Sequence, residues 1–121
     1  MAKPDESNIV AQKSFSFALR IIKAYKFLTE HNEYVLSKQL LRSGTSIGAN
    51  CREAKNAQSR LDFINILNIA LKEADETAYW LELLYEAEYI DSNSYKSIND
   101  DCVELIKLLT SIIKTAKSTT N

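Results

Sequence analysis

The sequence predicts an all-α fold, an antiparallel up-down-up-down four-helix bundle built as a single domain over residues 1–121. Helix-breaking residues are nearly absent, because the chain has two glycines and one proline, and the proline stands at position 4. Apolar residues recur at spacings of three and four in four long segments. The connections between these segments are short, so each helix is expected to run antiparallel to the one before it.

The first helix is expected at about residues 8–30, with Asn8 as its N-cap. Its inner face consists of Val10, Ser14, Phe17, Ile21, Ala24 and Leu28. A second apolar stripe, Phe15, Leu19 and Ile22, lies beside that face. Surplus apolar surface of this kind predicts oligomerisation, and a wide face inside the core of one bundle is the alternative.

The second helix is expected at about residues 37–56, with Ser37 as its cap. Gly44 and Gly48 stand four residues apart inside it, on one side of the helix. Because glycine lets another backbone come close, both are predicted to be tight helix-packing positions. A break near Gly44 is the alternative, but the apolar period continues across it and favours one helix.

The third helix is expected at about residues 59–88 and the fourth at about 92–117. Ser59 and Asp62 have the spacing of a capping box at the start of the third helix. The apolar residues of this helix cover much of its girth, which indicates burial on more than one side. The second stripe on this helix also suits oligomerisation.

The net charge of −1 hides an asymmetry between the two halves of the chain. Residues 1–60 hold ten basic and five acidic side chains, whereas residues 61–121 hold five basic and eleven acidic ones. Opposite halves suit attraction within the chain or between subunits. A basic first half would also suit nucleic acid. The alternative is that the helix faces are solvated and their difference in charge has no binding role.

Few residues suggest catalysis or metal binding. Two cysteines make no disulfide framework, and the only histidine, His31, has no ligand partner at metal-binding spacing. No apolar run is long enough for a signal peptide or a membrane span. We therefore expect a cytoplasmic protein that is not an enzyme, with no catalytic residue, no metal, no cofactor and no membrane contact.

Glu73 and Glu76 offer the one catalytic alternative, because they share a helix face as in bundle-type nucleotide pyrophosphatases that hold magnesium. This would make the chain a small metal-dependent nucleotide hydrolase. Such a site needs a second carboxylate pair on the next helix, but antiparallel geometry is expected to set these glutamates near Lys107. Salt bridges to basic residues of the second helix are the preferred interpretation.

A polar ridge projects from one side of the second helix, at steps of three and four residues. Its members are Gln39, Arg42, Ser46, Asn50 and Glu53. We interpret the ridge as a hydrogen-bonded seam against the third helix or a neighbouring subunit, with Arg42 paired to Glu73 or Glu76. A binding site for a partner is the alternative.

The same segment carries a family resemblance. The run QLLRSGTSIGANCRE at 39–53, continued by DFINILNIALKEA at 62–74 and ETAYWL at 76–81, resembles the four-helix-bundle intervening-sequence protein family. Its members were first noticed as reading frames inside insertions in bacterial large-subunit ribosomal RNA genes, and they are also described as ribosomal proteins. The resemblance implies a homopentamer of up-down-up-down bundles. A similar bundle is the accessory protein of diversity-generating retroelements, whose basic pentamer engages reverse transcriptase and nucleic acid.

The chain departs from the family where Cys51, Arg52 and Ala54 replace the frequent Ile, Ala and Gly. Its pI of about 5.8 also weakens a nucleic-acid role taken from basic relatives. The resulting hypothesis is a non-catalytic, oligomeric scaffold that binds itself and RNA, DNA or a nucleic-acid-processing protein. The exposed basic residues proposed for nucleic-acid contact are Lys13, Arg20, Lys38, Lys55 and Arg60.

Overall fold

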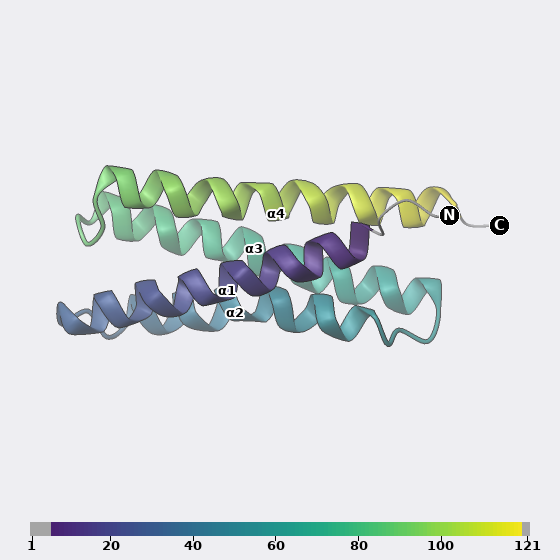
Figure 1. Cartoon of the computed structure of the whole chain (residues 1–121), viewed down its shortest axis with the longest axis horizontal. Helices are drawn as coiled ribbons and strands as arrows, with labels where there is room; N and C mark the ends of the chain where they lie inside the picture. The colour runs from purple at the N-terminus through teal and green to yellow at the C-terminus, as the bar shows by residue number, and fades with distance from the viewer. Residues whose placement is uncertain (1–5, 120–121) are drawn as a thin grey trace.

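The computed structural model describes residues 6–119, which form four α-helices (Figure 1). The helices are α1 (Glu6–Glu30), α2 (Leu36–Ala54), α3 (Arg60–Glu86) and α4 (Ser92–Ser118). Each boundary lies within two residues of the predicted one, and the all-α fold is confirmed. The alternative of a break near Gly44 is wrong, because α2 is continuous across it.

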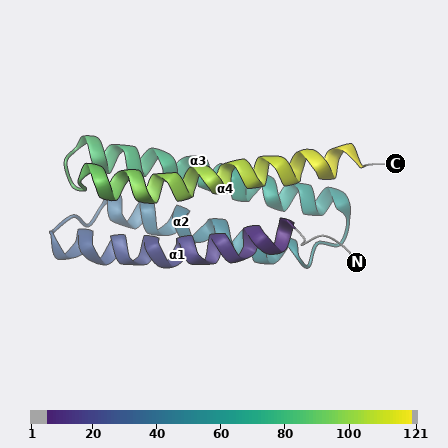
Figure 2. The same cartoon turned by 45° about the horizontal axis from the view of Figure 1, so that its top comes forward.

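The bundle consists of two helical hairpins, α1–α2 and α3–α4, laid side by side (Figure 2). Each helix contacts two others, in the order α1, α2, α3, α4 around the bundle, so α1 and α3 stand at diagonal corners. The connections 31–35 and 87–91 lie at one end, which we call the hairpin end. The start of α1, the connection 55–59 and the last turn of α4 lie at the other, the terminal end.

The core is drawn from all four helices. Its fully buried large side chains include Phe17 and Ile21 from α1, Ile47 from α2, Leu67 from α3 and Leu109 from α4. Burial of a side chain of this size is worth roughly 1.5–3 kcal/mol. No helix within residues 6–119 has the length and apolar content needed to cross a lipid bilayer.

The two glycines of α2 are close-packing positions, as predicted. A Cβ atom on Gly44 would lie 2.7 Å from Cγ1 of Ile21, and one on Gly48 would lie 3.3 Å from the carbonyl oxygen of Ser14. Ile21 and Ser14 both belong to α1. The two glycines therefore set how closely α1 and α2 approach.

The N-cap predicted for α3 is confirmed. The backbone N–H of Asp62 donates to Oγ of Ser59 at 3.0 Å. The Asp62 carboxylate in turn accepts from the backbone N–H of Gln58 at 3.1 Å, one residue earlier than in the usual reciprocal box.

The caps predicted for the first two helices are wrong. α1 is already helical from Glu6, so Asn8 lies inside it. α2 begins at Leu36, and Ser37 is an internal residue whose hydroxyl donates to the carbonyl of Glu33. The helix end is capped instead by the Glu33 carboxylate, which accepts from the backbone N–H groups of Val35, Leu36 and Ser37 at 2.6–3.2 Å.

The Glu33 cap is buried and charged. Burial alone would raise the pKa of Glu33, but the hydrogen bonds from three backbone N–H groups and from Ser37 outweigh it and hold the pKa below its usual value. The carboxylate also faces the positive end of the α2 dipole. It thereby fixes the direction in which α2 leaves the connection 31–35.

The close contact between Gly44 and Ile21 generates a stability prediction. Gly44→Ala should lower the free energy of unfolding by about 1–3 kcal/mol, because the new Cβ would lie within 3.0 Å of three side-chain atoms of the fully buried Ile21. This loss should appear although alanine is about 1 kcal/mol the better helix former. Urea unfolding of Gly44→Ala, Ile21→Ala and the double variant measures the coupling. Effects that add within ~0.5 kcal/mol would show that the two positions do not clash.

Candidate functional site

Arg42 of the polar ridge reaches from α2 to α3. The Arg42 guanidinium donates to Oε1 of Glu73 at 3.2 Å and also contacts Oε2 of Glu76. Trp80 adds its indole N–H to the same Glu76 oxygen at 2.9 Å. The hydrogen bonds from Trp80 and Arg42 hold the pKa of Glu76 below its usual value, and the bond to Glu76 raises the pKa of Arg42.

The ridge is less buried and less connected than a seam requires. The Arg42 side chain is 49% exposed in the single chain. Ser46 donates to the carbonyl of Arg42 at 2.6 Å, and Asn50 donates to the carbonyl of Ser46 at 2.8 Å, so both bond back to their own helix. Gln39 and Glu53 are exposed. Of the five ridge residues, Arg42 is therefore the one that bonds across to α3 in the described chain.

A buried polar contact between α2 and α3 escaped the sequence analysis. Thr77 donates its hydroxyl to Oγ of Ser43 at 2.9 Å, and both residues are fully buried. Small hydroxyl residues on otherwise apolar helix faces were the signal. This pair, together with Arg42 and Glu76, sets the register of α2 against α3.

The acids of α4 lie at a different position along the bundle axis, relative to α3, from the one expected. Sγ of Cys102 lies 3.4 Å from the carbonyl oxygen of Ala74, so the first half of α4, not Lys107, is level with Glu73 and Glu76. The expectation was wrong because this contact and the connection 87–91 set the register, not the helix midpoints.

These acids nevertheless do not complete a metal site. Asp101 pairs with Arg20 at 2.7 Å and Glu104 pairs with Lys13 at 3.1 Å, so both carboxylates contact α1. Glu73 and Glu76 contact α2 through Arg42. Among residues 6–119 no three acidic, histidine or cysteine side chains gather where a metal ion would bind. The arrangement lends no support to the metal-dependent hydrolase alternative.

Ion pairs connect the two halves of the chain. Every ion pair formed within the described residues joins a base of α1 or α2 to an acid of α3 or α4. The charge asymmetry of the sequence is thus used, at least in part, for attraction between the two hairpins. The basic side chains in these pairs are 40–49% exposed and the acidic ones 21–49%, so each pair contributes little on its own.

The five basic residues proposed for nucleic-acid contact do not form one surface. Lys13 and Arg20 are engaged by acids of α4, and Arg20 also donates to the hydroxyl of Ser97 at 2.9 Å. Arg60 donates to the carbonyl of Thr119 at the terminal end. Lys38 and Lys55 are exposed at opposite ends of α2.

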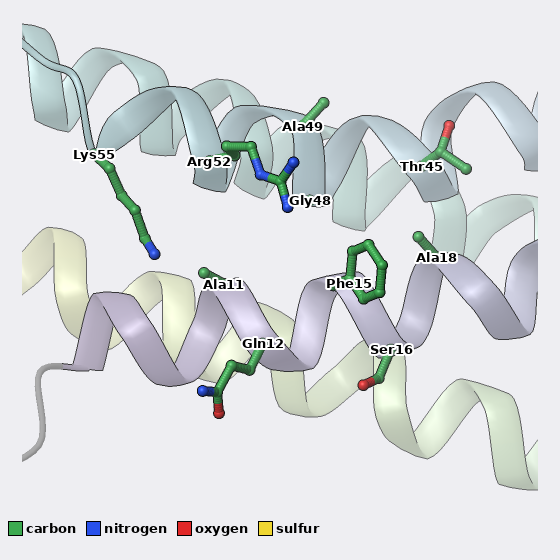
Figure 3. Close-up of a pocket in the computed structure, with 10 residues that line it drawn as sticks. All are labelled: Ala11, Gln12, Phe15, Ser16, Ala18, Thr45, Gly48, Ala49, Arg52 and Lys55. Carbon is green, nitrogen blue, oxygen red and sulfur yellow. The ribbon is translucent and has the colours of Figure 1, made fainter.

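A groove of about 820 Å³ lies between α1 and α2, on the outside of the bundle. Figure 3 shows Phe15 standing between the two helices, with Arg52 and Lys55 toward one end. Small residues form much of the lining, namely Ala11, Ala18, Gly48 and Ala49. Phe15 is 55% exposed and Leu19, one turn further along α1, is 50% exposed.

The second apolar stripes of α1 and α3 differ in how far they are buried. On α1, Phe15 and Leu19 remain exposed and only Ile22 is half-buried. On α3, the additional residues Ile66 and Leu84 are buried in the core. The wide face of α3 therefore belongs largely to the single bundle, whereas the stripe of α1 has no cover in the described chain.

The two cysteines are buried and unpaired. Burial raises the pKa of the Cys51 thiol and raises that of Cys102 to about 12. Neither thiol is therefore a ready nucleophile in the folded chain.

The chain is similar to known proteins in sequence and in structure. Residues 6–111 match the sequence model of a family described as 23S rRNA-intervening sequence protein. A crystal structure of a protein of unknown function, from the S23 ribosomal protein family of Bacteroides thetaiotaomicron, is 64% identical in sequence. The match covers 91% of this chain and 99% of that chain, with a TM-score of 0.89. A search of curated proteins found no match.

The exposure of the Arg42 pair generates a second prediction. Arg42→Ala should lower the free energy of unfolding by about 1 kcal/mol, because solvent screens half-exposed pairs. Since the pKa of Glu76 is lowered in the folded chain, this difference should be present above about pH 4.5 and shrink as the pH falls through the folded pKa.

Thermal and urea unfolding across pH measure the effect of Arg42→Ala. Lys96→Ala is the control, because Lys96 is exposed and forms no ion pair within residues 6–119. A loss of ~3–5 kcal/mol would contradict the prediction and would show that the pair is buried in the assembled protein.

Proposed function

The chain belongs to the 23S rRNA-intervening sequence protein family, and we propose that it functions as a non-catalytic, homo-oligomeric helical scaffold that binds a partner. The groove between α1 and α2 carries this proposal. Phe15 lines this groove and Leu19 follows it one turn further along α1, and both large apolar side chains are about half exposed. Apolar surface gathered in this way is typical of protein–protein contact.

The groove is suited to another helix of the same chain. Its small residues, among them Ala49 and Gly48, leave space for side chains of a second copy to reach the helix backbone. Covering Phe15 and Leu19 would stabilise the assembly by up to roughly 1.5–3 kcal/mol for each side chain. We propose a pentamer, the number that the sequence resemblance implies.

Four carboxylates that could serve in catalysis are engaged in ion pairs, and this supports a role without catalysis. The carboxylates of Glu73 and Glu76 are held by Arg42, and those of Asp101 and Glu104 are held by bases of α1. These contacts stabilise the packing of the helices. Binding through surfaces is therefore the function that the geometry supports best.

Light scattering after size exclusion tests the assembly. The wild-type protein should show several times the chain mass of 13.7 kDa at micromolar concentration. Phe15→Asp should reduce the mass toward one chain without unfolding it, because a carboxylate placed in the contact would be desolvated. Ser111→Asp, on the exposed side of α4, is the control and should assemble normally. A wild-type protein that stays monomeric on concentration would contradict the proposal.

Nucleic acid is the partner class that we propose to test, on the strength of a basic cluster at the terminal end. The cluster consists of the exposed residues Arg52, Lys55, Arg60 and Lys114. Copies of the chain arranged side by side in one direction would bring several such ends onto one face. Cations brought onto one face in this way attract phosphates even when the whole chain is slightly acidic.

Binding of labelled single-stranded RNA at several salt concentrations tests this partner. Lys55→Gln with Lys114→Gln should weaken binding and flatten the slope of log affinity against log salt by about one unit per lysine. Lys96→Gln, toward the hairpin end, is the matched control. Equal affinity of both variants and the wild-type protein would remove the terminal end as the phosphate-binding surface.

A further inference from the structure

A pocket of about 460 Å³ lies between α1 and α4, in the half of the bundle nearer the hairpin end. We call it the α1–α4 pocket, to separate it from the groove between α1 and α2. All four helices contribute to its lining. Its inner wall consists of core residues that are closed to water, namely Leu28, Leu40, Leu81 and Leu84. A mainly apolar hollow of about 300–1,000 Å³ is typical of a site for a small molecule.

The α1–α4 pocket forms where two neighbouring helices pack least extensively. The α1–α4 pair has fewer contacts than any other neighbouring pair of the bundle. Figure 1 shows α1 running obliquely to α4 and departing from it toward the hairpin end. Ala24 of α1 lines the pocket with a single methyl group, where a larger side chain would fill part of it. The space is therefore a consequence of helix crossing and of one small residue.

A hydrogen bond across the two helices fixes which residues face each other over the pocket. Arg20 of α1 donates to the hydroxyl of Ser97 of α4 at 2.9 Å. The helices run antiparallel, so three residues forward along α1 and three back along α4 bring Lys23 opposite Ser94. Lys23 and Ser94 are both exposed, and both line the pocket. One ammonium group and one hydroxyl group thus flank its rim at the same level.

The rim becomes apolar one helical turn nearer the hairpin end. Phe27 of α1 lines the pocket there and is 44% exposed. Its ring centroid lies 4.2 Å from that of His31, a contact that limits the motion of the ring. Ile90, four residues before Ser94, lines the opposite side and is half-buried. The rim therefore offers a polar pair of side chains followed by an apolar pair.

Lys23 is the rim cation that no acid engages. Lys13 and Arg20, the other bases of α1 on this side, are paired with Glu104 and Asp101. Lys23 forms no ion pair within residues 6–119.

Asp91 is the acid that lines the pocket. Its carboxylate accepts from the backbone N–H of Ser94 at 2.7 Å, at the positive end of the α4 dipole. The charge of Asp91 is thereby offset by its own helix, and the charge of Lys23 remains for a ligand.

We propose that the α1–α4 pocket binds a free medium-chain carboxylic acid, with the carboxylate between Lys23 and Ser94 and the chain along Phe27 and Ile90. One water occupies about 30 Å³ of liquid, and a methylene group is of similar size, so the pocket holds on the order of ten to fifteen heavy atoms. The acyl chains of membrane lipids are longer than this. The site goes beyond the scaffold role and uses a different surface.

Isothermal titration calorimetry of the full chain with octanoate tests the site. Octanoate should saturate at one molecule per chain, and its affinity should fall with salt because an ion pair contributes. Octyltrimethylammonium, which has the same chain and the opposite charge, should bind about tenfold more weakly or less. Acetate should give no saturable binding, because it has the carboxylate without the chain.

Two variants assign the binding to this pocket. Ala24→Leu should weaken octanoate binding about tenfold or more, because leucine occupies space that the chain needs. Lys23→Gln should weaken it about fivefold or more, because a charge-assisted hydrogen bond is lost. Lys23→Gln should leave the binding of octanol unchanged, which a purely structural effect would not. Lys26→Gln is the matched control, since Lys26 is an exposed base of the same helix that does not line the pocket.

The outcomes separate this site from the oligomer. Octanoate that does not bind at millimolar concentration, or that binds without saturating at one per chain, overturns the proposal. Equal affinity for octanoate and octyltrimethylammonium overturns the anionic class of ligand. Wild-type affinity in Ala24→Leu, with the fold verified by circular dichroism, places the ligand elsewhere; if that variant does not fold, unchanged affinity in Lys23→Gln overturns the assignment. A wild-type protein that is monomeric and binds octanoate contradicts the scaffold alone.

Discussion

The close approach of α1 to α2 is the constraint on which the rest of the structure depends. Because the Cβ of any other residue at Gly44 would clash with Ile21, the two helices stand nearer than ordinary side chains allow. Little space then remains between them for a large side chain, and Phe15 lies in the outer groove instead of the core. A half-exposed apolar side chain therefore stands on the outer side of a tightly packed hairpin.

Charge organises the other contacts. The α1–α4 pair has the least extensive packing of the four neighbouring pairs, and there ion pairs from Lys13 and Arg20 to α4 supplement the apolar contact. The basic and acidic halves of the chain thus become two hairpins that attract one another. Bases and acids left on the outer surfaces remain available for contacts between molecules.

Much of this could be predicted from the sequence. Helix period and breaker residues depend on local spacing, and the antiparallel run of α2 and α3 brings Arg42 to Glu73 and Glu76. The Glu33 cap could not, since it depends on how the connection 31–35 folds back. The position of Cys102 beside Ala74 could not be predicted either, because it depends on the connection 87–91, whose conformation follows no helical period. Phe15 and Leu19 indicated in the sequence that α1 has surplus apolar surface. What covers this surface depends on a second molecule and could not be predicted from one chain.

The two buried thiols make the hairpins distinguishable in solution. Cys51 lies in α2 near Ser14 of α1, whereas Cys102 lies in α4 against Ala74 of α3. Each thiol becomes reactive only when local opening exposes it, since the thiolate is the species that alkylating reagents attack. The native chain thus carries an internal probe in each hairpin, and the order in which the two sites are labelled reports which part of the core is exposed first.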